Sequence, residues 1–240
     1  MSGALRLAGV HTHIGRYHIL HGVDFEAQAG RTTLLLGRNG AGKTTCLRTI
    51  MGLWRASAGT VQWGEAALAG ARPSDVARLG VGYVPEGMAI FSDLSVKENI
   101  VLGARSGPPD EARLQWLFGF FPALSKFWAS RAGVLSGGQK QMLAIARALI
   151  EPRALLLVDE PTKGLAPAIV DALISCLADV KAKGATILLV EQNFRVAQAL
   201  GDAVAVMDNG RIVHRGAMAA LAQDRELQTR LLGLSLDSHQ

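Results

Sequence analysis

The chain has no run of about 18 apolar residues, the minimum for a helix that crosses a membrane. It holds only two cysteines, Cys46 and Cys176, which excludes a disulfide scaffold and favours a reducing compartment. The N-terminus becomes polar too early for a secretory signal. Aromatic residues make up only 5%, so the core must consist mainly of aliphatic side chains. These absences predict a globular cytoplasmic protein.

Apolar residues are abundant, at 49% of 240 residues against 19% charged, and the mean hydropathy is +0.23. Such a chain can bury a large core and is not disordered. Its 25 Lys and Arg exceed its 20 Asp and Glu, which gives a net charge of +5 and permits nucleic acid or an anionic membrane as a partner. The basic residues are scattered, however, so we expect a solvated surface and no nucleic-acid partner.

The order of patterns predicts an α/β fold with a mixed, mainly parallel sheet between helices. The first 65 residues indicate short strands with tight turns and an N-terminal antiparallel β subdomain. The middle of the chain is helical, and buried apolar strands then alternate with helices, as in a parallel sheet covered on both faces. The expected division is one domain, 1–240, with its core at 1–87 and 151–240 and an inserted helical lobe at 88–150.

A glycine-rich segment follows the apolar run 34–36 and precedes a helix expected from Lys43 to about Leu53. It matches G-x-x-x-x-G-K-[ST], the phosphate-binding loop. Its backbone N–H groups and the helix N-terminus would face phosphate, Lys43 would reach the β and γ phosphates, and Thr44 would offer its hydroxyl to Mg²⁺. The alternative is a glycine-rich turn with a solvated lysine. The predicted nucleotide-binding residues are Gly37, Arg38, Asn39, Gly40, Ala41, Gly42, Lys43, Thr44 and Thr45.

A second apolar strand, 155–158, ends in Asp159 and Glu160. Parallel strands bind ligands at their carboxyl ends, where these carboxylates would lie. Consecutive strand residues point to opposite faces, so the two acids must have different roles. We expect Asp159 to hold Mg²⁺ and Glu160 to act as general base toward the attacking water. The alternative is a solvated strand end.

The third motif is Leu135, Ser136, Gly137, Gly138 and Gln139, directly ahead of a helix. Locally it is a serine-capped helix entered through a Gly-Gly turn, but it also resembles the signature of ABC ATPases, and the resemblance extends from about residue 5 to residue 232. It implies a phosphate-loop NTPase fold, ATP and Mg²⁺ as cofactors, and ATP hydrolysis. It also implies a head-to-tail pair in which the signature contacts the γ phosphate of ATP held by the partner subunit.

Two substitutions resemble one branch of that family. Glu86 stands where most members carry a metal-binding glutamine, and Gln192 stands where most carry a histidine that senses the γ phosphate. With the loop 161–167, they resemble the ATP-binding subunits of branched-chain amino acid importers. Thr162 and Lys163 depart from that branch, and related importers of urea, amides or aromatic acids are the alternative. The resemblance implies Glu160 and Gln192 as catalytic residues, with Glu86 as a further Mg²⁺ ligand.

The same resemblance implies a set of partners. They are a second ABC ATPase subunit, expected to be a different sister chain with a homodimer possible in isolation, two transmembrane permeases and, indirectly, a solute-binding protein. The protein would lie peripherally on the cytoplasmic face of the inner membrane. The alternatives are a soluble ABC protein of DNA repair or translation, which one set of motifs without inserted heptads disfavours, and a subunit that binds ATP without cleaving it.

The sequence leaves open how adenine is held, whether the N-terminal histidines bind a metal, and what the aromatic residues of the helical lobe contact. The family usually stacks an aromatic on adenine where this chain has Ile14, and Tyr17 or His13 could take its place. A metal site is an alternative use of the nearby histidines, although no carboxylate or thiol joins them. In the helical lobe, we expect Phe118, Phe120 and Phe121 to form the core. We expect Phe127 and Trp128 to lie on a loop that faces the permease.

Overall fold

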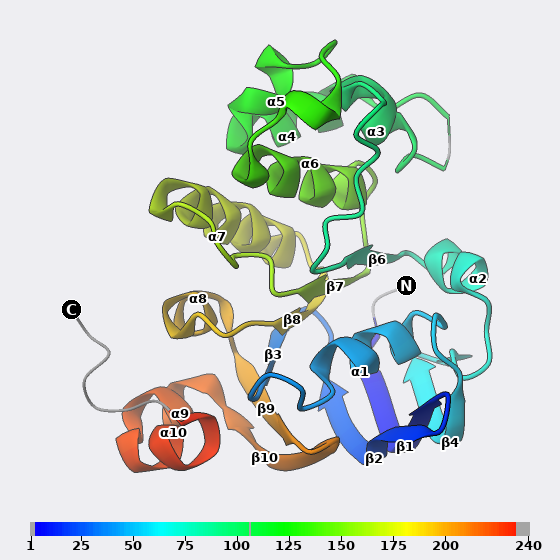
Figure 1. Ribbon diagram of the computed structural model, residues 1–240, viewed down its shortest axis with the longest axis vertical. Helices are drawn as coiled ribbons and strands as arrows, with labels where there is room; N and C mark the ends of the chain where they lie inside the picture. The colour runs from blue at the N-terminus through cyan, green and yellow to red at the C-terminus, as the bar shows by residue number, and fades with distance from the viewer. Residues whose placement is uncertain (1–2, 106, 234–240) are drawn as a thin grey trace.

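The computed structural model describes residues 3–105 and 107–233 and contains two sheets and a separate group of helices (Figure 1). The strands are β1 (Leu5–Ile14), β2 (Tyr17–Ala27), β3 (Thr32–Leu36), β4 (Ala56–Trp63), β5 (Ala66–Ala67), β6 (Val81–Val84), β7 (Leu155–Asp159), β8 (Thr186–Val190), β9 (Ala203–Asp208) and β10 (Arg211–Ala217). The α-helices are α1 (Lys43–Ile50), α2 (Pro73–Arg78), α3 (Val96–Val101), α4 (Glu111–Phe120), α5 (Pro122–Lys126), α6 (Gly137–Leu149), α7 (Pro167–Ala182), α8 (Phe194–Leu200), α9 (Met218–Gln223) and α10 (Arg225–Leu232).

The larger sheet has the strand order β10-β9-β3-β8-β7-β6. Its strands pair in parallel except at the β9–β10 hairpin, where Asn209 and Gly210 take positive φ angles of 45° and 71°. Strands β3, β7 and β8 are buried along their whole length, because apolar side chains pack on both faces. This sheet brings the carboxyl ends of β3, β7 and β8 together, and the predicted α/β class is confirmed.

The smaller sheet, β2-β1-β4-β5, is antiparallel, as expected, but the prediction of short strands was wrong. Strands β1 and β2 run for 10 and 11 residues. Gly9 and Gly22 lie inside these strands with positive φ angles of 59° and 77°, and the pairing register shifts beside Gly9. Such a bulge lets a long strand bend without ending.

Helices α3 to α6 form a group beyond the larger sheet, at the top of Figure 1. Helix α1 ends at Ile50 rather than near Leu53, because Gly52 takes a φ of 73°. Phe121 is fully buried in the lobe, with Phe118 and Phe120 partly buried beside the same core. Among the described residues, no helix has the length and apolarity to cross a membrane. The boundaries at 87/88 and 150/151 stay a prediction.

The expected open loop at Phe127 and Trp128 is packed instead. Both side chains are partly buried against the core, and Trp128 meets Phe118 edge-to-face with ring centroids 5.3 Å apart. Their backbone N–H groups donate to carbonyls of the short helix α5, so the turn that carries both rings is held at the end of this helix. The use of these two aromatics as a permease contact therefore gains no support from their exposure.

Candidate functional site

The glycine-rich loop joins β3 to α1 in a conformation that only glycine fits at two positions. Gly37 has a φ of 146°, and a Cβ there would lie 2.2 Å from Met207 O. Gly42 has a φ of 106° and caps α1 without a side-chain hydrogen bond. The first N–H groups of α1 therefore receive no side-chain cap and are available to an anion.

Lys43 lies at the entrance of this loop. Its Nζ donates to Gly37 O at 2.8 Å and to Arg38 O at 3.0 Å, and it lies 3.6 Å from Glu160 Oε1. Only 5% of the Lys43 side chain is exposed. The loop thus holds a poorly hydrated ammonium against its own carbonyls, where a phosphate oxygen would be a stronger acceptor.

Asp159 and Thr44 meet beside the loop. Thr44 Oγ1 donates to Asp159 Oδ1 at 3.2 Å, while the buried Asp159 Oδ2 has no hydrogen-bond partner among the described residues. Burial raises the pKa of Asp159 to about 6, and the nearby carboxylates of Glu160 and Glu86 add to that rise. An orphaned carboxylate oxygen beside a hydroxyl is the donor set that suits Mg²⁺, so the residues present fit this ion.

Asp159→Asn is expected to stabilise the nucleotide-free protein at pH 7.5 by about 1–3 kcal/mol, because it removes a buried charge. Because the pKa of Asp159 is higher in the folded than in the unfolded state, its ionisation destabilises the fold. This destabilisation is absent below about pH 4, grows up to about pH 6 and is constant above. Urea unfolding at pH 4 and at pH 7.5 measures it. The exposed control Asp93→Asn should change stability by less than about 0.5 kcal/mol. A gain for Asp159→Asn that is equal at pH 4 and 7.5 would contradict this.

Glu160 follows β7 with a φ of 45°, a conformation that costs free energy for a residue with a side chain. Its carboxylate oxygen Oε1 accepts a hydrogen bond of 2.6 Å from Gln192 Nε2. The same Gln192 nitrogen donates to Asn39 Oδ1 of the glycine-rich loop at 2.8 Å. The structure therefore gathers the predicted residues from the ends of β3, β7 and β8 at one place.

A cavity of about 310 Å³ lies beside Lys43 and Glu160. It is lined by Ile19, Asn39, Gly40, Gly42, Lys43, Thr44, Thr45, Glu86, Glu160 and Lys163. Ile19 and Lys163 were not predicted as site residues. Glu86 lines the cavity, but its carboxylate accepts a 2.7 Å hydrogen bond from Lys163 rather than meeting Thr44 or Asp159. Its role as a metal ligand stays a prediction.

The signature residues lie elsewhere. Ser136 caps α6 and forms a capping box with Gln139, in which each side chain accepts from the other's backbone N–H. Gly138 packs so closely that a Cβ would lie 2.3 Å from Ile169 Cδ1. Helix α6 belongs to the upper helices in Figure 1, whereas α1 lies beside β1 and β2. The signature does not line the cavity that the glycine-rich loop forms.

Sequence reasoning missed Glu191, which is 3% exposed. Its Oε1 accepts from the backbone N–H and the hydroxyl of Thr162, and its Oε2 accepts from the backbone N–H groups of Gln192 and Asn193. Burial raises its pKa, which these hydrogen bonds oppose. Glu191 therefore joins the loop after β7 to the loop after β8. An acid directly after a buried strand was the signal available.

The tip of the β1–β2 hairpin carries the residues considered for adenine. Ile14 pairs with Tyr17, whose side chain is 61% exposed. The nearby histidines gather around His18: the rings of His11 and His13 stack on its ring, the ring of His21 lies tilted against it, and His11 Nδ1 is 3.0 Å from His18 Nε2. Within residues 3–105 and 107–233, no group of three or more His, Cys, Asp or Glu side chains is arranged to hold a metal ion.

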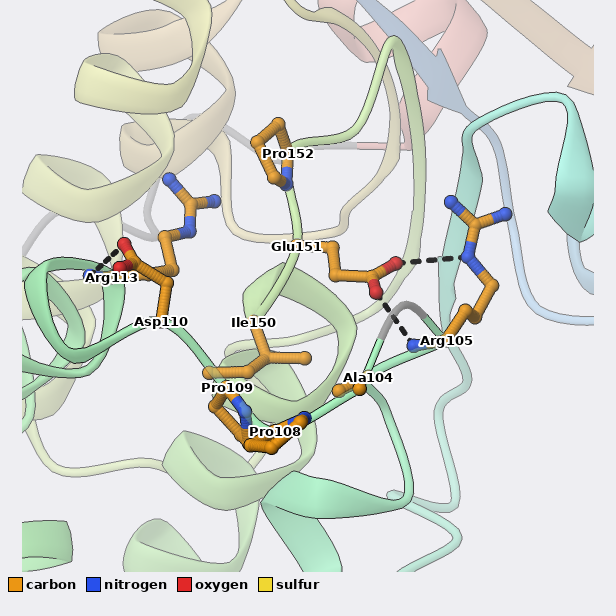
Figure 2. A pocket seen from close by; sticks show the side chains of 10 residues that line it. Ala104, Arg105, Pro108, Pro109, Asp110, Arg113, Ile150, Glu151 and Pro152 are labelled. Atoms are coloured by element: carbon orange, nitrogen blue, oxygen red, sulfur yellow. Dashed lines mark hydrogen bonds and ion pairs between the residues drawn. The ribbon is translucent and has the colours of Figure 1, made fainter.

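A second cavity, of about 360 Å³, lies in the helical lobe (Figure 2). Figure 2 shows Arg105 and Glu151 turned toward each other on one side, with Asp110 and Arg113 on the other. Arg105 donates to Glu151 through its backbone N–H and its Nε. None of the predicted site residues lines this cavity, so it is distinct from the site around Lys43.

Comparison with known proteins identifies the family. Residues 20–163 match the model of the ABC transporter domain. The chain is 38% identical to the high-affinity branched-chain amino acid transport ATP-binding protein BraG of Pseudomonas aeruginosa, across 93% of this chain and 97% of that protein. The chain belongs to the ABC transporter family. The predicted family resemblance is confirmed.

Further ABC proteins are similar to this chain in sequence and in structure. The probable branched-chain amino acid transport ATP-binding protein LivF of Archaeoglobus fulgidus is 32% identical across 96% of this chain and 99% of that protein. A nucleotide-free ATP-binding cassette from an ABC transporter superposes with a TM-score of 0.81 at 26% identity, covering 98% of this chain and all of that one. An ADP-bound cassette has a TM-score of 0.79 with the same identity and coverage. ABC ATP-binding proteins bind adenine nucleotides and are ATPases that energise transport.

Proposed function

We propose that this chain binds and hydrolyses ATP to energise an importer of branched-chain amino acids. The observation that carries the proposal is that Lys43 and Gln192 both contact the Glu160 carboxylate, at the cavity that Lys43 and Glu160 line, close to the orphaned Asp159 oxygen. The names of BraG and LivF support the solute class. In this proposal the chain acts peripherally at the inner face of the membrane with two permeases, a second ATPase subunit and, indirectly, a solute-binding protein.

The residues divide the chemistry among them. The backbone N–H groups of the glycine-rich loop and the Lys43 ammonium bind the β and γ phosphates. Thr44 and Asp159 would hold Mg²⁺, which when bound neutralises charge on those phosphates. Glu160 accepts the proton of the attacking water as the new P–O bond forms and the bond to ADP breaks. Gln192 orients the Glu160 carboxylate through its amide hydrogen bond of 2.6 Å.

The signature 135–139 acts in this proposal on ATP held by the second subunit. Its position at the N-terminus of the 13-residue helix α6, away from the chain's own cavity, supports a role in trans. The partial positive charge of that helix end suits a phosphate. Two such chains, or this chain and a sister chain, would then complete each other's sites.

Gln192→His is expected to speed ATP turnover of the isolated chain about fivefold. A histidine can donate a charge-assisted hydrogen bond, which would stabilise the transition state by about 1 kcal/mol more than a neutral amide. Turnover is measured for the chain alone and with the sister subunit and permeases. Gln115→His, on an exposed face of α4, is the matched control. An unchanged rate in both settings would contradict a limiting role for residue 192.

The solute class is tested by uptake. Cells that lack this chain should lose import of radiolabelled leucine, and the wild-type gene should restore it while Glu160→Gln should not. Labelled urea and phenylalanine distinguish the alternatives, because restored uptake of either instead of leucine would reassign the solute. ATP hydrolysis by the purified chain is measured in parallel, so that the ATPase and solute assignments can fail separately.

A further inference from the structure

Lys163 is a second ammonium in the cavity and lies three residues after Glu160. Its Nζ donates to Glu86 Oε1 at 2.7 Å and lies 3.9 Å from Glu160 Oε2. Its side chain is 64% exposed, against 5% for Lys43. Nothing in the proposed chemistry yet uses this residue, although it lines the same cavity as Lys43 and Thr44.

The two ammoniums approach different oxygens of one carboxylate. Lys43 Nζ is 3.6 Å from Glu160 Oε1, and Lys163 Nζ is 3.9 Å from the other oxygen, Oε2. Since Glu160 would activate the water that attacks the γ phosphate, it marks the terminal end of a bound triphosphate. Lys163 therefore lies at the end of the cavity that ATP fills and ADP leaves empty.

The ion pair between Lys163 and Glu86 can be exchanged for a contact between Lys163 and a phosphate. Lys43 is held by two loop carbonyls in a nearly buried position. Among the described residues, by contrast, the Lys163 ammonium donates its one hydrogen bond to Glu86, whose side chain is 41% exposed. Exposed ion pairs of this kind contribute little stability. A terminal phosphate carries more negative charge than one carboxylate and accepts charge-assisted hydrogen bonds. The exchange therefore favours phosphate.

We propose that Lys163 is a specificity residue, which releases Glu86 and binds the terminal phosphate when ATP is present but stays paired with Glu86 when ADP is present. The proposal rests on the proposed function, because it takes Glu160 as the mark of the γ phosphate. It assigns to Lys163 the preference of this site for a nucleoside triphosphate over a diphosphate.

The test is the binding of AMP-PNP, an uncleaved triphosphate, and of ADP, measured by calorimetry in Mg²⁺. Lys163→Met should weaken AMP-PNP binding roughly tenfold and ADP binding less than about twofold. Lys163→Arg keeps the charge and should recover most of the difference. Lys97→Met, an exposed lysine of α3, is the matched control and should change neither affinity.

A double variant separates contact from net charge. Glu86→Gln with Lys163→Met removes one charge of each sign, so the cavity keeps its net charge but lacks the ammonium. We expect the preference for AMP-PNP over ADP to stay low in this variant. A restored preference, or equal weakening of both nucleotides by Lys163→Met, would overturn the proposal. Failure of the wild-type chain to bind either nucleotide would instead overturn the proposed function.

Discussion

Lys43→Ala is expected to abolish ATP binding, with a loss of at least about a hundredfold in affinity. The variant removes the nearly buried ammonium that lies at the entrance of the loop, 3.6 Å from Glu160. A single ammonium facing several phosphate oxygens makes charge-assisted hydrogen bonds that no neighbour replaces. Calorimetric titration with ATP and Mg²⁺ measures the loss.

Two further variants make this result interpretable. Lys43→Met keeps most of the side-chain volume and should lose binding equally, which separates the charge from packing. Lys126→Ala removes an exposed lysine of the helical lobe and should leave binding unchanged. Circular dichroism should show intact secondary structure in all three. Micromolar ATP binding by folded Lys43→Met would mean that the loop is not the phosphate site.

Glu160→Gln is expected to keep ATP binding but to lower turnover by about 10²- to 10⁴-fold, because an amide cannot accept the proton of the attacking water. Gln has the same shape and can keep the backbone conformation at this position. Because ATP stays uncleaved, the variant should also accumulate as an ATP-dependent dimer on gel filtration. Glu65→Gln, which changes an exposed glutamate, is the control and should hydrolyse ATP normally.

Two outcomes would contradict this assignment. Turnover at the wild-type rate would show that another group takes the proton. Loss of ATP affinity to the same degree as in Lys43→Met would show that Glu160 serves binding rather than the chemical step. The comparison of affinity with turnover therefore decides between the two roles of this carboxylate.

The sequence predicted best those residues whose placement follows from their immediate neighbours in the sequence or from the strand that they end. The glycine-rich loop is contiguous, and the edge rule for parallel sheets placed Asp159 at the carboxyl end of its strand, where the structure has its Oδ1 3.2 Å from Thr44 Oγ1. The contact between Glu86 and Lys163 could not be predicted, because these residues are 77 positions apart on two loops whose conformations depend on packing. The long β1 strand was missed because a glycine inside a bulge has the same sequence signal as a turn.

Glu191 has a consequence for how information about the bound nucleotide spreads. Because its carboxylate accepts hydrogen bonds from Thr162 on one loop and from the Gln192 backbone on the other, the two loops cannot shift relative to each other without breaking buried hydrogen bonds. The position of the loop after β7 is therefore coupled to that of the loop after β8. In the proposed mechanism, a displacement of Gln192 by the γ phosphate would be passed to Thr162, which is next to Lys163, through these bonds. The proposed contacts of Gln192 and Lys163 with the nucleotide are thus linked through a single buried acid.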